Sequence, residues 1–144
     1  MDKNQIMSIL PHREDMLLIE EAYLKEDGSA EAFYTVRGDE FFLRGHFPDY
    51  PVVPGVILCE MIAQSACVLM QGEAENMAGK TPFYTGIDNV RFRSQVRPKD
   101  RVRIETKLTG KKACFYFIHG ELYVGDKLCV KGDFSFAVVD ANKV

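Results

Sequence analysis

The strongest constraint in this sequence is a cluster of three prolines that runs directly into an uninterrupted apolar segment. Pro48, Pro51 and Pro54 fix φ and remove amide donors, so residues 47–54 can form neither a helix nor a central strand. Nothing from residue 56 to residue 70 breaks a helix, and Gly55 just before it permits close backbone approach. The sequence therefore predicts an ordered, irregular loop followed by a helix over residues 56–70.

Two polar side chains interrupt this apolar helix. A helix that is apolar on nearly all sides is buried in a globular protein. Glu60 and Gln64 lie four residues apart and so share one face of it. An unpaired carboxyl group in a buried position usually has a raised pKa and takes up a proton, and a neutral carboxylic acid can act as a general acid. Glu60 is therefore a candidate general acid; the alternative is that it pairs with an arginine or caps a backbone group.

A candidate base and a candidate anion site flank the start of the same helix. His46 stands at the entrance to the stiff loop, and histidine is the side chain best suited to accept a proton at neutral pH. The first helical amides, those of Gly55 and Val56, have no intrahelical acceptor and can bind a carbonyl oxygen that gains negative charge. Together these groups suit proton removal beside a carbonyl, coupled to loss or transfer of an oxygen function one carbon further on.

The complete motif resembles a known enzyme family. It reads His-Phe-Pro-x-x-Pro-x-x-Pro-Gly-Val and then Glu-x-x-x-Gln, with Glu60 fourteen residues after His46. This is similar to the (3R)-hydroxyacyl-[acyl-carrier-protein] dehydratases of bacterial type II fatty-acid synthesis, of the FabZ type. The resemblance extends to residues 10–13, 86–93 and 96–100 and covers roughly residues 10–139. The related A-type dehydratase and isomerase carries Asp at the position of Glu60, so the Glu favours the Z type.

The resemblance implies a reaction and roles for the residues of the site. Neutral His46 would remove a proton from C2 of a (3R)-3-hydroxyacyl thioester, while Glu60 would protonate the departing 3-hydroxyl, giving a trans-2-enoyl thioester and water. The Gly55 amide would hold the thioester oxygen, and Gln64 would orient Glu60 or its water. The substrate would arrive on the phosphopantetheine arm of an acyl carrier protein. The His and Glu of one site would come from opposite subunits of a homodimer, and a trimer of dimers is the commoner assembly in the family.

The rest of the chain predicts strands. Residues 16–25 and 29–37 form a hairpin around the tight turn at Asp27 and Gly28. Residues 83–93, 101–108, 113–123 and 128–139 are rich in β-branched and aromatic residues, with breaks at 98–100, at Gly110 and at 125–126. Asp2 and Gln5 indicate a capped first helix that Pro11 ends. The expected class is α+β, with a long central helix wrapped by an antiparallel sheet of about six strands, which the resemblance identifies as a hotdog fold.

Six basic residues, which we call the basic stripe, are concentrated in one segment of a chain whose net charge is -3. All are odd-numbered, so within each strand they share a face: Arg91, Arg93, Arg97, Lys99, Arg101 and Arg103. The stripe is either a solvated outer strand face or a docking site for the acidic carrier protein and its phosphopantetheine phosphate. In the second case, Arg and Lys would steer the carrier protein by long-range attraction and bind the phosphate through charge-assisted hydrogen bonds.

Composition limits the possible classes of protein. The 144 residues fit one domain, 1–144, and a pI of about 5.6 provides no global basic field for nucleic acid. The three histidines fit no metal pattern, so we expect a mechanism without metal or cofactor. No secretory signal and no bilayer-spanning segment is found, which predicts a soluble cytoplasmic protein. Four cysteines without CxxC spacing are expected to be reduced core residues: Cys59, Cys67, Cys114 and Cys129.

Some positions depart from the family pattern and widen the range of possible activities. The family has an aromatic-proline-aromatic run where residues 14–16 stand, an Asp-Arg pair where residues 20–21 stand, and usually Gly where Lys99 stands. We expect His12 to be a structural hydrogen-bonding residue, and what it and Arg13 contact is left open. A divergent strand at 114–119 leaves room for a polyketide or aryl-polyene substrate. The sequence is also compatible with a hotdog thioesterase, with an isomerase that moves the double bond from C2 to C3, and with an idle acyl-binding module.

Overall fold

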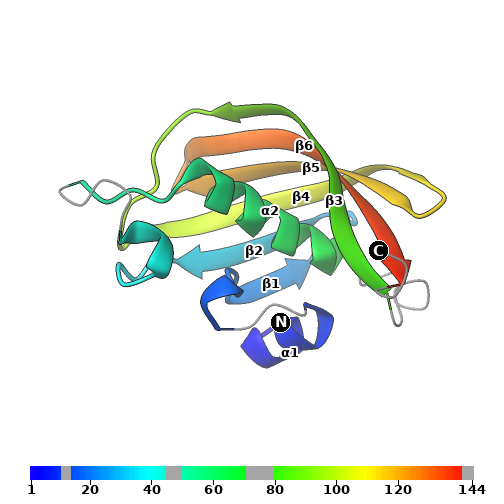
Figure 1. Ribbon diagram of the computed structural model, residues 1–144, viewed down its shortest axis with the longest axis horizontal. Coiled ribbons are helices and arrows are strands. Elements are labelled where there is room, and N and C mark those ends of the chain that lie inside the picture. The colour runs from blue at the N-terminus through cyan, green and yellow to red at the C-terminus, as the bar shows by residue number, and fades with distance from the viewer. Residues whose placement is uncertain (11–13, 45–49, 71–79, 141–144) are drawn as a thin grey trace.

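The structure is a computed structural model that describes residues 1–10, 14–44, 50–70 and 80–140. Within these residues, a six-stranded antiparallel sheet curves around one long helix, α2 (Gly55–Leu69), as Figure 1 shows. The strand order across the sheet is β1-β2-β4-β5-β6-β3. This arrangement is a hotdog fold of the α+β class, as the sequence predicted.

Five of the six strands follow the predicted segments within a few residues, whereas the segment predicted over residues 16–25 is a strand only from Glu21 to Leu24. The strands are β1 (Glu21–Leu24), β2 (Ala30–Thr35), β3 (Lys80–Phe92), β4 (Arg101–Lys112), β5 (Phe115–Val124) and β6 (Lys127–Asp140). A short helix, α1 (Lys3–Ile9), lies beside β1, and two 3-10 turns, Glu14–Met16 and Phe41–Leu43, complete the described elements. Every neighbouring pair of strands is antiparallel.

Local signals at the first helix and the first hairpin are confirmed. The Asp2 side chain accepts a hydrogen bond from the Gln5 amide at 2.9 Å, and the Asp2 amide donates to Gln5 Oε1 at 2.8 Å, which completes a capping box. The turn between β1 and β2 contains Gly28 at φ +87°, a backbone conformation that glycine adopts without steric cost.

The predicted break at Gly110 is wrong. Strand β4 continues through Gly110 to Lys112, with a register shift between Leu108 and Gly110 where it pairs with β5. Gly110 lies opposite Phe117, and a Cβ added there would meet the Phe117 ring at an ordinary contact distance of 3.6 Å. The glycine therefore marks an irregularity within a long strand, which is a common position for glycine in a sheet.

Close packing between α2 and the concave face of the sheet forms the core. Residues of β5 alternate, and Tyr116, Ile118 and Leu122 are buried on the face that α2 covers. Ile62 of α2 lies directly over Gly120, where an added Cβ would come within 2.3 Å of Ile62 Cγ2. The absence of a side chain at this position lets the helix approach the sheet backbone.

Strand β3 forms one edge of the sheet, and its apolar side chains are only partly covered. Tyr84, Ile87 and Phe92 lie opposite residues of β6, yet they remain 37%, 50% and 56% exposed. Val56 at the start of α2 is 77% exposed. An edge strand with exposed apolar side chains is a typical site of association with another chain.

All four cysteines are free thiols. Cys59, Cys67 and Cys129 are buried, as predicted. Cys114, in the turn between β4 and β5, is only partly buried. Among the described residues, none of the helices combines the length and the apolar character needed to cross a lipid bilayer.

We predict that Gly120→Ala lowers the free energy of unfolding by about 1–3 kcal/mol, because the added methyl group overlaps a stiff β-branched side chain. Urea unfolding followed by circular dichroism measures the change. Gly110→Ala is the matched control, since its new methyl group finds an ordinary contact, and it should change stability by less than about 1 kcal/mol. Equal destabilisation by both variants would contradict this account of the helix–sheet contact.

Candidate functional site

Helix α2 presents Glu60 and Gln64 on one face, as their spacing predicted. Gln64 is 1% exposed, and its side chain reaches the segment that precedes β1. Its Oε1 accepts from the Leu18 amide at 2.8 Å, while its Nε2 donates to the Met16 carbonyl at 2.7 Å and to Glu60 Oε1 at 3.3 Å. These contacts fix the orientation of the amide, and they hold one oxygen of the Glu60 carboxyl group. Glu60 itself is partly buried in the single chain.

A pocket of about 60 Å³ opens beside this pair. Helix α2 contributes Glu60, Ala63, Gln64 and Cys67 to its wall, and the sheet contributes Pro82, Tyr84 and Phe136. The wall is mostly apolar, with a few polar groups gathered at Glu60, which is the usual composition of a small-molecule site.

Burial and the nearby Glu60 carboxylate raise the pKa of the Cys67 thiol to about 12. The same two causes raise the pKa of the Tyr84 phenol well above its ordinary value. Both groups therefore remain neutral throughout the physiological pH range. Within this pocket, the Cys67 and Tyr84 side chains are therefore neither bases nor nucleophiles, and the Tyr84 hydroxyl is a donor.

The start of α2 has the geometry expected of an anion site. The amides of Ile57 and Leu58 both donate to the Pro54 carbonyl, at 3.0 and 3.2 Å, so the amides of Gly55 and Val56 precede the first intrahelical bonds. The ring of Phe92 lies against Gly55, where an added Cβ would be 2.7 Å from Phe92 Cε1. Glycine at position 55 is therefore required for β3 to approach this end of the helix.

The predicted base, His46, lies outside the described residues, as do His12 and Arg13. The structure therefore brings Glu60 and Gln64 together beside the pocket. Gly55 and Val56 lie at the start of the same helix and are not among the residues that line this pocket. The role of His46 stays a prediction. Near the end of the proline-rich loop, the Val53 amide donates a hydrogen bond to the Val96 carbonyl at 2.8 Å. This bond ties the loop to the segment between β3 and β4.

A buried carboxylate that sequence reasoning missed anchors the chain ahead of the same loop. Glu40 is 5% exposed and accepts hydrogen bonds from the Tyr34 hydroxyl at 2.8 Å, the Arg37 amide at 2.9 Å and the Gly38 amide at 2.8 Å. Burial alone would raise the pKa of Glu40, but these donors outweigh it and the net pKa is lowered. No local sequence pattern distinguishes Glu40 from the exposed Asp39 beside it.

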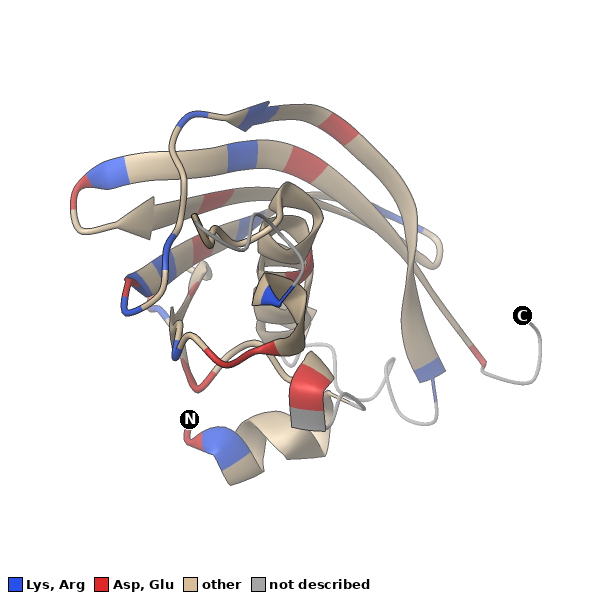
Figure 2. Ribbon diagram, turned by 60° about the vertical axis from the view of Figure 1, so that its left-hand side comes forward, with Lys and Arg blue, Asp and Glu red and all other residues tan. Residues whose placement is uncertain are grey.

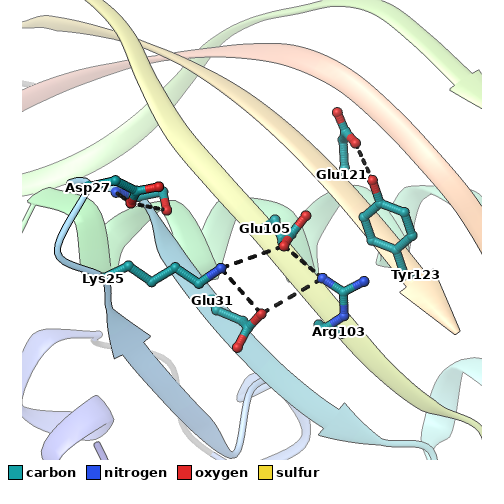
Figure 3. A network of polar contacts seen from close by, with 8 residues as sticks. Lys25, Asp27, Glu31, Arg103, Glu105, Glu121 and Tyr123 are labelled. Atoms are coloured by element: carbon teal, nitrogen blue, oxygen red, sulfur yellow. Dashed lines mark hydrogen bonds and ion pairs between the residues drawn. The ribbon is translucent and has the colours of Figure 1, made fainter. Parts of the chain in front are cut away.

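The basic stripe is divided between two environments. Arg101 and Arg103 lie on the outer face of β4, where Arg101 is 3.5 Å from Glu21 and Arg103 is 2.7 Å from Glu105. Figure 3 shows Arg103 between Glu105 and Glu31, with Lys25 closing the cluster. Figure 2 shows the same mixture of both charge signs along the strands. These two arginines therefore belong to a charge-balanced sheet surface.

The other four members of the stripe are exposed residues at one end of the sheet: Arg91, Arg93, Arg97 and Lys99. The Arg97 guanidinium lies 3.9 Å above the ring of Tyr50, near the start of the proline-rich loop. Lys99 has φ +77°, which explains on steric grounds why glycine is usual at this position in the resembling family.

A histidine on the outer face also forms a polar cluster that the sequence did not reveal. His119 of β5 lies 2.9 Å from Asp133 and 2.8 Å from Glu121, and Tyr123 donates to the same Glu121. Burial lowers the pKa of His119, but the two carboxylates outweigh burial and the net pKa is raised. The cross-strand pairing of His119 with Asp133 creates this cluster on the face opposite the pocket.

The fold and the site define the class of protein: a hotdog-fold chain with a candidate acid–base group on its central helix, beside a largely apolar pocket. Residues 10–133 match the model of the FabA-like domain family. The chain is 41% identical over 139 residues to the 3-hydroxyacyl-[acyl-carrier-protein] dehydratase FabZ of Pelotomaculum thermopropionicum, covering 96% of this chain and 99% of that protein. It is 38% identical over 138 residues to FabZ of Clostridium perfringens strain SM101, with the same coverage. The chain therefore belongs to the FabA-like family, within its FabZ group of 3-hydroxyacyl-[acyl-carrier-protein] dehydratases.

Solved structures share the fold at lower identity. The dehydratase heterocomplex ApeI:P from Xenorhabdus doucetiae superposes with a TM-score of 0.80 at 21% identity, covering 95% of this chain and 92% of that one. A mutant of the fluoroacetyl-CoA-specific thioesterase FlK, in complex with fluoroacetate and CoA, superposes with a TM-score of 0.64 at 14% identity, covering 78% and 91%. Dehydratases and thioesterases thus share this fold, and the side chains of the site have to separate the two activities.

We predict that Glu40→Gln destabilises the protein by about 1–3 kcal/mol at pH 7, because three donors lose an ionised acceptor. Since the pKa of Glu40 is lower in the folded chain, its stabilising effect is present above the unfolded pKa and is lost as the pH falls through the folded value. The difference between the variant and the parent should therefore shrink below about pH 4. Urea unfolding at several pH values measures it, with the exposed Asp39→Asn as control; a difference that does not depend on pH would contradict the assignment.

Proposed function

We propose that this chain removes water from (3R)-3-hydroxyacyl thioesters carried by acyl carrier protein, with His46 as the base and Glu60 as the acid. The observation that carries the proposal is the Glu60–Gln64 pair, which places a fixed carboxyl group at the edge of an apolar pocket. The family membership supplies the reaction class, a hydro-lyase acting on 3-hydroxyacyl chains.

Each group in the proposal performs one part of a balanced elimination. Neutral His46 takes the proton from C2, and the electron pair forms the C2–C3 double bond as the bond from C3 to the hydroxyl oxygen breaks. Glu60 gives its proton to the departing hydroxyl, so water leaves and a trans-2-enoyl thioester remains. The Gly55 amide, with Val56 beside it at the positive end of the helix, stabilises charge on the thioester oxygen. Gln64 holds the Glu60 carboxyl group in place.

The proposal assigns the basic stripe to the carrier protein. The exposed members Arg91, Arg93, Arg97 and Lys99 are expected to contribute more than Arg101 and Arg103, which already have carboxylate partners on the sheet. Docking of an acidic carrier at this end of the sheet would place the phosphopantetheine phosphate near cationic side chains. Salt should therefore weaken the use of carrier-bound substrates more than that of free acyl thioesters.

The proposal also includes a second copy of the chain. Dehydratases of this group act as oligomers, and we propose that two copies of this chain form a homodimer that associates along β3, with a trimer of dimers as the larger assembly. The exposed side chains of that edge, Tyr84, Ile87 and Phe92, offer an apolar surface for a partner to cover. A cytoplasmic location belongs to the same proposal, since the three buried free thiols suit a reducing compartment.

We predict that His46→Ala and Glu60→Gln each lower the dehydration rate by about 10²- to 10⁴-fold while leaving the fold intact, because each variant removes one proton-transfer group. Hydration of enoyl thioesters followed by absorbance, together with mass spectrometry of 3-hydroxyacyl carrier proteins, measures both directions. Parental turnover in either variant would contradict the roles. Release of free thiol would indicate a thioesterase instead, and a double bond between C3 and C4 in the product would indicate isomerisation.

Mixing the two inactive variants tests the shared site. If His46 and Glu60 of one site come from opposite subunits, unfolding and refolding the variants together should restore about a quarter of the parental rate, because half of the random dimers are mixed and each has one complete site. Activity assays after refolding, with each variant refolded alone as control, measure this recovery. Mixed dimers that form without regaining activity would contradict a site built from two subunits.

A further inference from the structure

Tyr84 connects the edge strand to the helix turn that carries Glu60. The Tyr84 hydroxyl donates to the Cys59 carbonyl at 2.8 Å, and Cys59 directly precedes Glu60 in α2. The Tyr84 ring stacks on Phe136 of β6 with centroids 4.9 Å apart and an interplanar angle of 28°. The ring position is therefore fixed by the sheet, while the hydroxyl is fixed by the helix.

The Glu60 turn is consequently held from two sides. Gln64 ties it to the segment before β1 through the Met16 carbonyl and the Leu18 amide. Tyr84 ties it to β3, at the far edge of the same sheet. Tyr84 also lines the pocket next to Glu60, so a change in its hydrogen bond alters the position of the carboxyl group relative to a bound acyl chain.

The chemistry of the Tyr84 hydroxyl suits a structural donor. Burial is the largest cause that raises the pKa of Tyr84 well above its ordinary value, so the hydroxyl keeps its proton at neutral pH. A neutral phenol is too weak a base to take the proton from C2 of a substrate. Its effect on the reaction therefore passes through the position of the helix turn.

We infer that Tyr84 is a positioning residue for Glu60: its hydroxyl holds the Cys59–Glu60 turn of α2 against β3, so that the carboxyl group faces the pocket. This inference rests on the proposed function. It assigns to Tyr84 a role in the rate of the chemical step rather than in substrate affinity, since small displacements of a catalytic group reduce turnover strongly.

The test is Tyr84→Phe, which removes the hydroxyl and keeps the ring that stacks on Phe136. We predict a fall in kcat of about 3- to 30-fold with KM within about 2-fold of the parent, because the interaction acts in the transition state through Glu60. Tyr23→Phe is the matched control, since it removes a tyrosine hydroxyl bonded to Glu21 on the exposed side of β1 and should leave kcat unchanged. Thermal unfolding of each variant establishes that the folded enzyme is being compared.

A double-mutant cycle separates positioning from other roles. In a Glu60→Gln background, assayed at high enzyme concentration, Tyr84→Phe should cause less than about 2-fold further loss, because the residue acts through the carboxyl group. Parental kcat in Tyr84→Phe, a change confined to KM, or an equal loss in both backgrounds would each overturn the inference. A parent enzyme without dehydratase activity, or Glu60→Gln at the parental rate, would instead overturn the proposed function.

Discussion

The close contact between α2 and the concave face of the sheet is the constraint on which the rest of the structure depends. Gly120 removes a side chain beneath Ile62, and Gly55 removes one beneath Phe92, so the sheet approaches the helix at both places. The helix is thereby fixed along its length rather than at one end. Because the side chains of a helix have fixed directions, fixing the helix also fixes where Glu60 and Gln64 point.

The buried amide of Gln64 converts this packing into a defined chemical site. An amide in an apolar core has to satisfy its donors and its acceptor, and Gln64 does so with backbone groups of the chain before β1. The remaining donor hydrogen points to Glu60. The requirement to satisfy a buried polar group and the requirement to hold the Glu60 carboxyl group are therefore met by the same side chain.

Local sequence signals predicted most of the elements but not the contacts between them. The end of the proline-rich loop located the start of α2 within one residue, and Gly28 located the first hairpin. The prediction of a break at Gly110 was wrong, because the residues around a glycine inside a strand can be the same as those around a glycine at the end of a strand. The spacing of Glu60 and Gln64 placed them on one face, but the backbone partners of Gln64 lie more than forty residues away in the chain. Such contacts depend on tertiary packing, just as the ion pairs of Arg101 with Glu21 and of Arg103 with Glu31 depend on how the strands are arranged in the sheet.

The thiol of Cys67 illustrates how the same environment serves both stability and chemistry. The product of the proposed reaction, a trans-2-enoyl thioester, is an electrophile at C3, and a thiolate in the pocket would add to it. Burial and the Glu60 charge hold the pKa of Cys67 at about 12, so at neutral pH the thiol carries its proton and packs as a small apolar side chain. The burial of Cys67 therefore also keeps this nucleophile inactive.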